Sequence, residues 1–264
     1  MIYDNIKGVP RFRADEYSKK NSIYCVLIPI INEGERIKLE LERAKKAGIH
    51  KVADIIICDG GSTDGSTHED LMKSLCVNTL LTKKGAGKQG AQLRMGMYYA
   101  LEQGYEGIIT IDGNNKDSIE DIPSFINKLV DGYDLIQGSR FIKGGRAVNT
   151  PLTRWIAVRF IHAPIISITA RKWYTDTTNA YRGYSRKYLI HDKVKPLRDV
   201  FQTYELLAYM STRANQLGLK SCEIPVARIY PRYGKTPTKI KGVVGNSELL
   251  KILFANLCGK YLPR

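Results

Sequence analysis

The feature that most constrains the fold is a repeated alternation of short apolar runs with amphipathic segments in the first half of the chain. Each run is rich in β-branched residues and ends in a polar turn, and a segment with helical spacing follows. The expected strands are 25–30, 54–58, 77–81, 108–111 and 133–137. Strands that alternate with helices usually pair in parallel, because each crossover helix packs back on the sheet. We therefore expect an α/β fold with a Rossmann-like, doubly wound, mostly parallel sheet.

The second half of the chain departs from this alternation. Its expected parts are an apolar but interrupted stretch (155–169), a helix (205–217) and a strand (226–230). Residues 1–22 are expected to form an irregular N-terminal extension, and residues 241–264 a tail with a short amphipathic helix at 248–257. The stretch 155–169 carries Arg159, His162 and Pro164 and is too interrupted to span a bilayer. Its composition suits either a helix lying on a membrane surface or an ordinary packed helix pair.

Polar side chains follow the expected strand at 108–111. Asp112, Asn114 and Asp117 come directly after it, and ligands bind beyond the carboxyl ends of strands in open α/β sheets. Oxygen ligands at this spacing suit a hard cation. A turn that caps the next helix through Ser118 explains the same residues equally well.

Net charge and its distribution point to an anionic partner. The chain of 264 residues has 43% hydrophobic and 25% charged residues and a net charge of +15. Two blocks, 135–175 and 224–247, contain twelve Lys or Arg residues and no acid. A block of this kind favours diphosphate ligands, nucleic acid or an anionic membrane surface, although a solvated basic face is the commoner explanation of scattered lysines.

Cysteine usage and hydropathy suggest a compartment. The five cysteines form no CxxC pair, and Cys25 and Cys58 lie inside expected strands, so reduced core thiols are expected. Neither a signal peptide nor an apolar run of about 18 residues is present. We expect a cytoplasmic protein, with peripheral attachment to the inner face of a membrane as an option.

One glycine pattern allows a different function. Gly85-x-Gly87-x-x-Gly90 follows an expected strand and opens a helix, which is the context of a dinucleotide-binding loop. However, it follows the third strand instead of the first, and it leaves Asn32, Glu33, Asp59 and Asp64 without a role. A NAD-type oxidoreductase is therefore a lesser alternative.

Six short motifs in order are more specific than any one of them. They are Pro29-Ile30-Ile31-Asn32-Glu33, Asp59-Gly60-Gly61-Ser62-Thr63-Asp64-Gly65, Gly87-Lys88-Gln89-Gly90, Asp112-Gly113-Asn114, Gly138-Ser139-Arg140 and Asp176-Thr177-Thr178-Asn179-Ala180-Tyr181-Arg182. The chain resembles the family 2 inverting glycosyltransferases of the GT-A fold, most of all the branch of dolichyl-phosphate mannose synthases and polyprenyl-phosphate sugar transferases. The resemblance implies a domain at 23–240, with a nucleotide-binding half (23–138) and an acceptor-binding half (139–240) that forms a C-terminal extension on the acceptor side.

The resemblance also implies roles for individual residues at the nucleotide end. Residues that match the nucleotide-sugar-binding positions are Pro29, Asn32, Glu33, Asp59, Lys88, Asp112 and Gly113. Carboxylates there accept hydrogen bonds from base N–H groups and ribose hydroxyls.

The expected metal site departs from the family pattern. Asp112 and Asn114 match the outer positions of the metal-binding Asp-x-Asp motif, but Asn114 replaces the second aspartate. A neutral amide holds Mg²⁺ or Mn²⁺ more weakly than a carboxylate does. We therefore expect weak metal binding, with Lys116 supplying part of the positive charge.

Three arginines match family positions that hold the leaving diphosphate and the acceptor's phosphate. They are Arg140, Arg154 and Arg232, and each lies in an acid-free block with no carboxylate nearby in sequence. A guanidinium fork suits two phosphate oxygens at once. For a single arginine, a surface salt bridge is the competing explanation.

The implied reaction transfers a sugar from a UDP- or GDP-sugar to a phosphorylated polyprenol with inversion at the anomeric carbon. A phosphate acceptor is already anionic and needs no strong base, whereas a hydroxyl acceptor does. Asp176 or Glu205 could be that base, which keeps a hydroxyl acceptor as the main alternative. A nucleic-acid-binding module is a lesser alternative, because no reader motif accompanies the positive charge.

Overall fold

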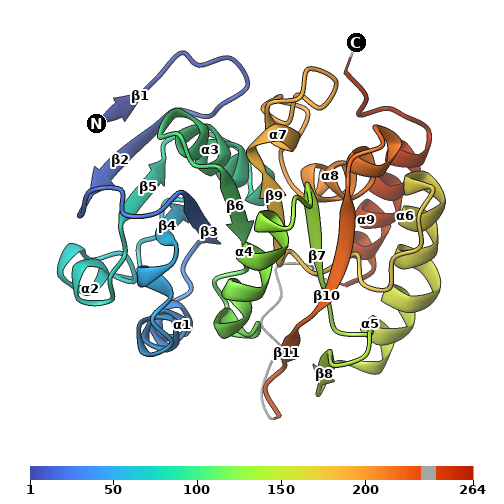
Figure 1. Ribbon diagram of the computed structural model, residues 1–264, viewed down its shortest axis with the longest axis horizontal. Helices are drawn as coiled ribbons and strands as arrows, with labels where there is room; N and C mark the ends of the chain where they lie inside the picture. Colours follow the sequence, from blue (N-terminus) through green and yellow to red (C-terminus); the bar gives the residue numbers. More distant parts are fainter. Residues whose placement is uncertain (233–241, 264) are drawn as a thin grey trace.

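The computed structural model describes residues 1–232 and 242–263, and of 242–246 only the helical backbone. Its centre is a nine-stranded sheet of order β1-β2-β5-β4-β3-β6-β9-β7-β10, and β8 and β11 form a small second sheet (Figure 1). The strands are β1 (Ile2–Tyr3), β2 (Phe12–Glu16), β3 (Tyr24–Ile30), β4 (Asp54–Asp59), β5 (Thr79–Lys83), β6 (Gly107–Thr110), β7 (Leu135–Ser139), β8 (Arg146–Val148), β9 (Arg182–Ser185), β10 (Ser221–Pro225) and β11 (Ala227–Ile229).

Helices cover both faces of the large sheet. They are α1 (Glu35–Lys46), α2 (Glu69–Ser74), α3 (Gln89–Glu102), α4 (Ile122–Val130), α5 (Leu152–Ala157), α6 (Ala163–Ala170), α7 (Arg186–Leu189), α8 (Glu205–Gln216) and α9 (Gly242–Leu257), with short turns η1 (Ile49–Lys51), η2 (Ile119–Asp121) and the π-helical η3 (Val158–His162). Two buried clusters result: α3 and α8 pack on one face, α1 and α4 on the other. Strand β3 contributes side chains to both clusters, because Leu27 and Ile28 point to opposite faces of the sheet.

The parallel core follows the alternation that the sequence predicts. Strands β5, β4, β3 and β6 pair in parallel in that order, so the chain order reverses between β3 and β6. Each of the five expected strands is present. Strand β7 begins at Leu135, two residues later than predicted. The reason is that the N–H of Tyr133 still donates to the Lys128 carbonyl at the end of α4.

Strand β9 gives the sheet its mixed character. It lies between β6 and β7 and runs antiparallel to both. Residues 176–182, the last of the six motifs, are mostly irregular, since β9 begins at Arg182. The motif residues before it form the loop that leads into the sheet. This loop carries Asp176 and Asn179 to the candidate site.

The N-terminal segment differs from the expectation. Residues 12–16 are a sheet strand, β2, which pairs antiparallel with β5 from Phe12↔Lys83 to Glu16↔Thr79. Phe12 is fully buried and stacks on Tyr3 with ring centroids 4.5 Å apart. The prediction of an irregular extension is therefore wrong for this part of residues 1–22. Of the five residues FRADE only Phe is a strong strand former, and Ala, Asp and Glu are disfavoured in strands, so local propensity did not mark a strand in the sequence.

The C-terminal half adds a helical layer beside β10. Segments α5, η3 and α6 run on from one another, and α9 packs on α6 and α8 with Leu253 buried among Ile166, Ala170 and Ala208. The helix predicted at 248–257 is confirmed as the second part of α9. The predicted boundary at 240–241 lies outside the described residues. All five cysteines are free, and Cys25 and Cys58 are buried as expected.

Candidate active site

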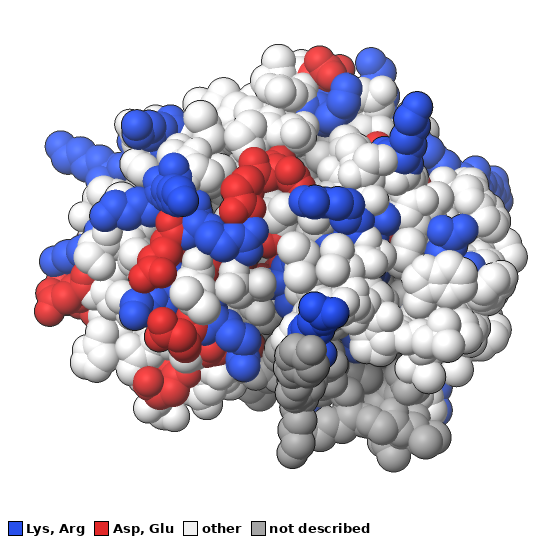
Figure 2. Space-filling view, turned by 90° about the horizontal axis from the view of Figure 1, so that it is seen from below, with Lys and Arg blue, Asp and Glu red and all other residues white. Residues whose placement is uncertain are grey.

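The polar loops singled out in the sequence gather at one edge of the sheet. Glu33 follows β3, Asp59 ends β4 and Asp112 follows β6, and these strands are parallel neighbours. The point where the strand order reverses, between β3 and β6, is where open α/β sheets bind ligands. Figure 2 views the end of the molecule toward which β10 runs into β11. Acidic side chains gather on one half of that face, and the half nearer α5 and α6 shows mainly basic and neutral ones.

The loops after β3 and β4 are tied into one unit. The N–H of Asn32 donates to Ser62 Oγ at 2.9 Å, and the N–H of Thr63 donates to Asn32 Oδ1 at 2.8 Å. Gly34 N–H donates to Asp64 Oδ2 at 2.8 Å. Asp59 is almost fully buried, and its carboxylate accepts bonds from the backbone of 61 and 62. Asp59 therefore shapes this edge as well as presenting charge there.

Pro29 and Glu33 lie at the same edge. Pro29 is near the end of β3, opposite Cys58 of β4 and beyond the last residue of β3 that pairs with β6. A proline fits there because no ladder bond to β6 is lost. Glu33 is 8% exposed and forms an ion pair of 2.8 Å with Arg36.

The glycine loop delivers Lys88 and Gln89 to the site. Lys88 is exposed and precedes α3. Gln89 Nε2 donates to Asp112 Oδ1 at 3.0 Å, which joins the start of α3 to the loop after β6. Sequence reasoning placed Gln89 in the glycine motif but gave it no role.

Packing explains the glycines of this loop. A Cβ on Gly90 would lie 2.6 Å from the Thr203 carbonyl oxygen, and Gly87 has φ +94°, where a side chain is strained. Gly90 thus lets α3 approach the 201–203 segment closely. Packing therefore accounts for Gly87 and Gly90 without a dinucleotide.

The loop after β6 is held in place by contacts with β3 and α1. A Cβ on Gly113 would lie 2.5 Å from Ile30 Cγ2, so only glycine fits between Asp112 and Asn114. Glu40 of α1 is fully buried and accepts the N–H of Asn115 at 2.7 Å. Arg43 donates to Asn115 Oδ1 at 2.8 Å. The direction of Asp112 is therefore fixed by α1 as well as by β6.

Arg228 is the main residue that sequence reasoning missed. It lies on β11 with 5% exposure, and its guanidinium joins Asp117 and Asp112, the latter at 3.1 Å. Burial raises the pKa of Asp112, but the opposing effects of Arg228 and Lys116 are stronger and leave that pKa below its usual value. Asp117 is fully buried beneath Arg228 instead of facing a ligand. The two carboxylate partners of Arg228 are 111 and 116 residues away in sequence, so only its place in an acid-free block hinted at a role.

Tyr230, two residues further on, gathers three cations. Lys116 Nζ lies 5.1 Å from the centroid of its ring, and the guanidinium carbons of Arg228 and Arg154 lie at 5.8 and 5.9 Å. Arg154 also donates to the Tyr230 hydroxyl at 3.2 Å. Burial, helped by the neighbouring Arg228, lowers the pKa of Lys116 to about 8. We call Lys116, Arg154 and Arg228 the basic cluster.

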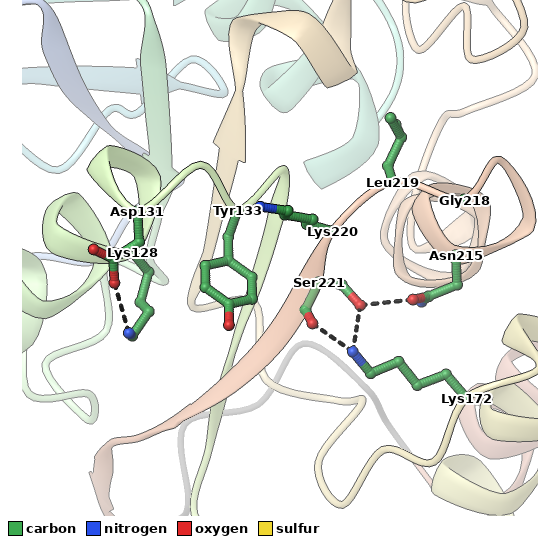
Figure 3. Close-up of a pocket in the computed structure, with 9 residues that line it drawn as sticks. All are labelled: Lys128, Asp131, Tyr133, Lys172, Asn215, Gly218, Leu219, Lys220 and Ser221. Carbon is green, nitrogen blue, oxygen red and sulfur yellow. Dashed lines mark hydrogen bonds and ion pairs between the residues drawn. The ribbon is translucent and has the colours of Figure 1, made fainter.

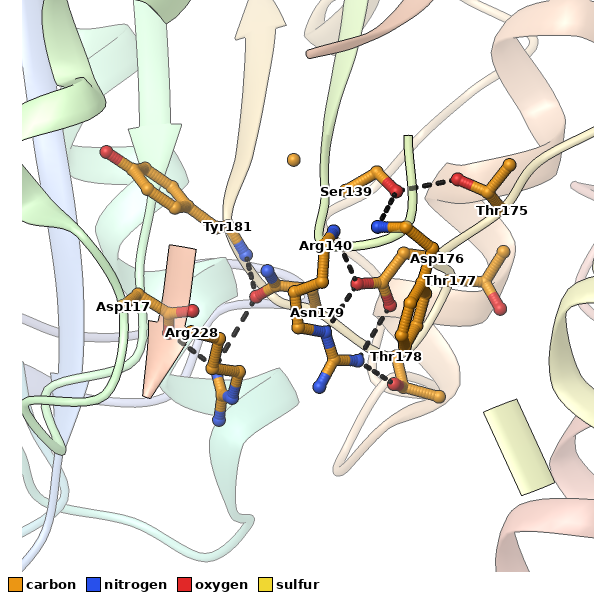
Figure 4. A network of polar contacts seen from close by, with 12 residues as sticks. Asp117, Ser139, Arg140, Thr175, Asp176, Thr177, Thr178, Asn179, Tyr181 and Arg228 are labelled. Carbon is orange, nitrogen blue, oxygen red and sulfur yellow. Dashed lines mark hydrogen bonds and ion pairs between the residues drawn. The ribbon is translucent and has the colours of Figure 1, made fainter. Parts of the chain in front are cut away.

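Arg140 lies beside this cluster and has a carboxylate partner. Its guanidinium donates to both oxygens of Asp176, with Nε–Oδ2 at 2.6 Å and Nη2–Oδ1 at 2.9 Å, and both side chains are buried (Figure 4). The absence of a nearby carboxylate in sequence was therefore misleading. A carboxylate with both oxygens bound to arginine is poorly placed to take a proton, which argues against Asp176 as a base.

The last two predicted residues lie at the margin of the site. Glu205 accepts the N–H of Thr203 at 2.6 Å and its hydroxyl at 3.1 Å, at the start of α8. Arg232 is exposed and lies two residues after Tyr230, at the end of the first described range.

The residues at Asp112 do not fit a divalent cation well. Both carboxylate oxygens of Asp112 already accept bonds, from Gln89 and from Arg228. The two aspartates, 112 and 117, are balanced by Arg228 and Lys116, so a further +2 charge would lie beside two buried cations. Asn114 Oδ1 is buried without a hydrogen-bond partner, but it is neutral. Among the described residues no three His, Cys, Asp or Glu side chains group as a metal site.

A separate hollow of about 730 Å³ lies away from this edge. It opens where β10 begins, and its lining includes Lys128, Lys172 and Lys220 (Figure 3). Lys172 donates to Ser221 Oγ at 2.8 Å. No residue predicted for the site lines this hollow, so we assign it no part in the chemistry.

A sheet of this order, with its ligand loops at the reversal point, defines the class: the fold is that of the GT-A glycosyltransferases. Residues 25–192 match Glycosyl transferase family 2, and the chain belongs to that family. It is a glycosyltransferase. This family assignment rules out both lesser alternatives, the NAD-type oxidoreductase and the nucleic-acid-binding module.

Two similar proteins have names that belong to the polyprenyl-phosphate sugar transferases. The chain is 28% identical to the undecaprenyl-phosphate mannosyltransferase of Micrococcus luteus over 230 residues, covering 84% of this chain and 89% of that protein. It is 26% identical to the polyprenol monophosphomannose synthase of Mycolicibacterium smegmatis, covering 76% and 75%. The fold also matches glucosyl-3-phosphoglycerate synthase from Mycobacterium tuberculosis, crystallised with Mn²⁺, UDP and phosphoglyceric acid (TM-score 0.62, 16% identity, 91% and 79% coverage).

Proposed function

We propose that the protein transfers a sugar from a UDP- or GDP-sugar to a polyprenyl phosphate at a membrane surface, with inversion at the anomeric carbon. The names of the relatives in the polyprenyl-phosphate branch support the acceptor class. The observation that carries the proposal is the basic cluster around Tyr230, with Arg140 beside it, next to the polar loops after β3 and β4. The polar loops suit the nucleoside of a donor substrate. The basic cluster and Arg140 suit the donor's diphosphate and the phosphate of a second substrate.

The donor would lie across the reversal point of the sheet. Its nucleoside meets the loops of Asn32, Glu33 and Asp59, and Lys88 and Asp112 lie on the side of the diphosphate and sugar. In this orientation the leaving diphosphate points toward Lys116 and Arg228. Their positive charge stabilises the negative charge that develops as the bond from C1 to the β-phosphate oxygen breaks.

The acceptor phosphate supplies its own nucleophile. One of its oxygens attacks C1 in line while the diphosphate leaves from the opposite face, and the electron pair of the broken bond stays on the diphosphate. A phosphate monoester has a second pKa near 6, so it carries nearly two negative charges at neutral pH and needs no base. Arg140, Arg154 and Arg232 are the side chains we assign to the acceptor phosphate.

The state of the candidate bases supports the same acceptor. Asp176 is bound by Arg140 through both oxygens, and Glu205 accepts two bonds from Thr203. Neither carboxylate is poised to deprotonate a hydroxyl group. A hydroxyl acceptor, with Glu205 as the base, is the second candidate.

The test uses purified protein with radiolabelled UDP- and GDP-sugars and either undecaprenyl phosphate or undecaprenol. We expect product with the phosphate only, and a Glu205→Gln variant that keeps turnover within about threefold, because its amide oxygen can still accept the bond from the Thr203 N–H. A collapse of turnover in Glu205→Gln, or product with the free alcohol, would contradict the proposal in favour of a hydroxyl acceptor.

A lipid acceptor requires the protein to approach a membrane. No helix among the described residues is long and apolar enough to cross one. The surface we assign to the membrane lies on α5, η3 and α6. Its exposed apolar side chains are Leu152, Trp155, Ile156, Phe160, Ile161 and Ile168, together with Trp173 just after α6. The chain from 135 to 175 contains no acidic residue. Exposed apolar and aromatic residues beside cations suit an anionic bilayer interface.

This surface is tested by flotation with vesicles of anionic or neutral lipid. We expect binding to anionic vesicles that weakens with salt, and a loss of about tenfold or more in Phe160→Ser/Trp173→Ser, which removes two side chains that are 68% and 69% exposed. The control is Val130→Ser, since Val130 is equally exposed, at 68%, on α4. Equal loss in both variants, or no binding to anionic vesicles, would overturn the assignment.

A further inference from the structure

Two buried cations, Lys116 and Arg228, lie where the family's metal-binding motif would hold a divalent cation. Arg228 and Lys116 are both buried, each with 5% of its surface exposed, and both interact with Asp112. Arg228 comes from β11, 116 residues further along the chain than Asp112. Tyr230, on the same segment, covers both cations with the face of its ring. This is a built arrangement, because β11 is fixed by the bond from Ile229 N–H to the Lys116 carbonyl.

The charges in this arrangement balance without a divalent cation. Asp112 and Asp117 contribute two negative charges, and Arg228 and Lys116 two positive ones. A bound diphosphate adds negative charge, which side chains of the site must then stabilise. A guanidinium has five N–H groups. The partners of Arg228 among the described residues are Asp112, Asp117, Asn179 and the Tyr230 hydroxyl, which take at most four of them, so Arg228 can donate to a phosphate oxygen while it stays paired.

We propose that Arg228 and Lys116 bind the donor's diphosphate directly and do the work that a divalent metal does in glycosyltransferases with an Asp-x-Asp motif. The inference rests on the proposed function, since it assumes a nucleoside diphosphate donor. Asn114 then needs no carboxylate, which accounts for the departure from the Asp-x-Asp pattern. During transfer the C1–oxygen bond breaks, the electron pair remains on the diphosphate, and these two side chains meet the added charge.

The experiment measures binding, by calorimetry, of UDP and GDP and of UMP and GMP in excess EDTA and in Mn²⁺. We expect one diphosphate to bind with the same affinity, within about threefold, in both conditions. Lys116→Met and Arg228→Lys should each weaken the diphosphate about tenfold or more and the matching monophosphate much less, because a hydrogen bond to a charged group is worth about 1.5–3 kcal/mol. Arg228→Lys keeps the charge beside Asp117 and so protects the fold.

The control is Arg186→Gln. Arg186 donates to the Leu101 carbonyl at 3.0 Å and follows β9, whose last residue pairs with Gly107 at the start of β6. It therefore lies at the opposite end of the sheet, and its replacement should leave nucleotide affinity unchanged. Electron paramagnetic resonance of Mn²⁺ gives a second readout. The wild-type protein should add no signal of protein-bound Mn²⁺ to the spectrum of Mn²⁺ with the same diphosphate in solution.

The outcomes separate the inference from the proposed function. Diphosphate binding that appears only with Mn²⁺, or variants that bind the diphosphate as well as wild type, would overturn the inference and leave the glycosyl transfer standing. Failure of every nucleoside diphosphate to bind under either condition would overturn both. Turnover that persists in full chelation would agree with the inference.

Discussion

At the scale of single residues, the site is organised by buried ion pairs between distant parts of the chain. Arg140 and Asp176 are 36 residues apart, and Arg228 reaches Asp112 across 116. Such pairs are costly to break, because removing one partner leaves an unpaired charge in a medium of low polarity. The same pairs decide which carboxylates are available for chemistry.

The Arg140–Asp176 pair gives a direct prediction. In Asp176→Asn the buried guanidinium loses its anionic partner, so the free energy of unfolding should fall by about 3–5 kcal/mol, measured by urea denaturation. Asp131→Asn is the control, since the Lys128–Asp131 pair is exposed and should matter by less than about 1 kcal/mol. A stable Asp176→Asn protein without turnover would instead indicate that Asp176 is the base.

His162 gives a prediction for pH. Burial lowers the pKa of His162 to about 4, and the nearby Arg154 acts in the same direction. Between its ordinary value of about 6.5 and that value, the unfolded chain takes up a proton that the folded protein does not. The free energy of unfolding should therefore fall as pH falls through this window, by up to about 3 kcal/mol.

His162→Gln should reduce this loss of stability, measured by urea denaturation at pH 7, 6, 5 and 4. Both proteins share every other titrating group, so the difference between their curves isolates the histidine. Parallel curves for wild type and His162→Gln would show that this side chain is not the cause.

At the scale of secondary-structure elements, the position of α3 depends on how closely its first turn approaches the 201–203 segment. The N–H of Lys88 donates to the Gln202 carbonyl at 2.9 Å, and Gly90 leaves no space for a Cβ against Phe201 and Thr203. The helix start in turn holds Gln89 against Asp112. Gly90 thus affects the position of Gln89 and Asp112 through packing, without contacting a substrate.

The glycine motif allows a matched pair of alanine variants. Gly90→Ala should lower the free energy of unfolding by about 1–3 kcal/mol, because backbone atoms must move, and it should also weaken nucleotide binding. Gly85→Ala should change stability by about 0.5 kcal/mol or less, since the nearest atom to its Cβ would be 3.9 Å away. Greater damage from Gly85→Ala, in urea denaturation or nucleotide titration, would contradict this packing explanation.

At the scale of the whole molecule, the N-terminal segment completes the sheet on which the site is built. Strand β2 covers the edge of β5, and Phe12 enters the same buried cluster as α3 and α8. An unpaired β5 would expose its backbone groups to other chains. The large sheet therefore extends from residue 2 to residue 225 of the chain.

Phe12→Ala tests this arrangement. Loss of a fully buried aromatic side chain should lower the free energy of unfolding by about 3–5 kcal/mol. Ile2→Ala, at a position that is 63% exposed in the neighbouring β1, should have little effect. Equal and small effects, measured by thermal and urea denaturation, would mean that residues 1–22 are a loose extension after all.

The sequence by itself determined the parallel core and the place of the ligand edge. Five runs of β-branched residues with helical spacing between them admit few other arrangements, and polar residues at strand ends must then meet at one edge. The departures Asn114 and Lys116 were also visible in the sequence, because they depend on residue identity within one short motif.

Only the tertiary structure decided which charges meet. Arg228, Tyr230 and Asp117 come together through the pairing of β11 with β8 and its bridge to the loop after β6, and Arg140 finds Asp176 across a loop. Local patterns report periodicity and turn chemistry, whereas an ion pair forms between side chains whose separation in sequence carries no information about their distance in space. For this reason the strands could be predicted from the chain, and the partners of its arginines could not.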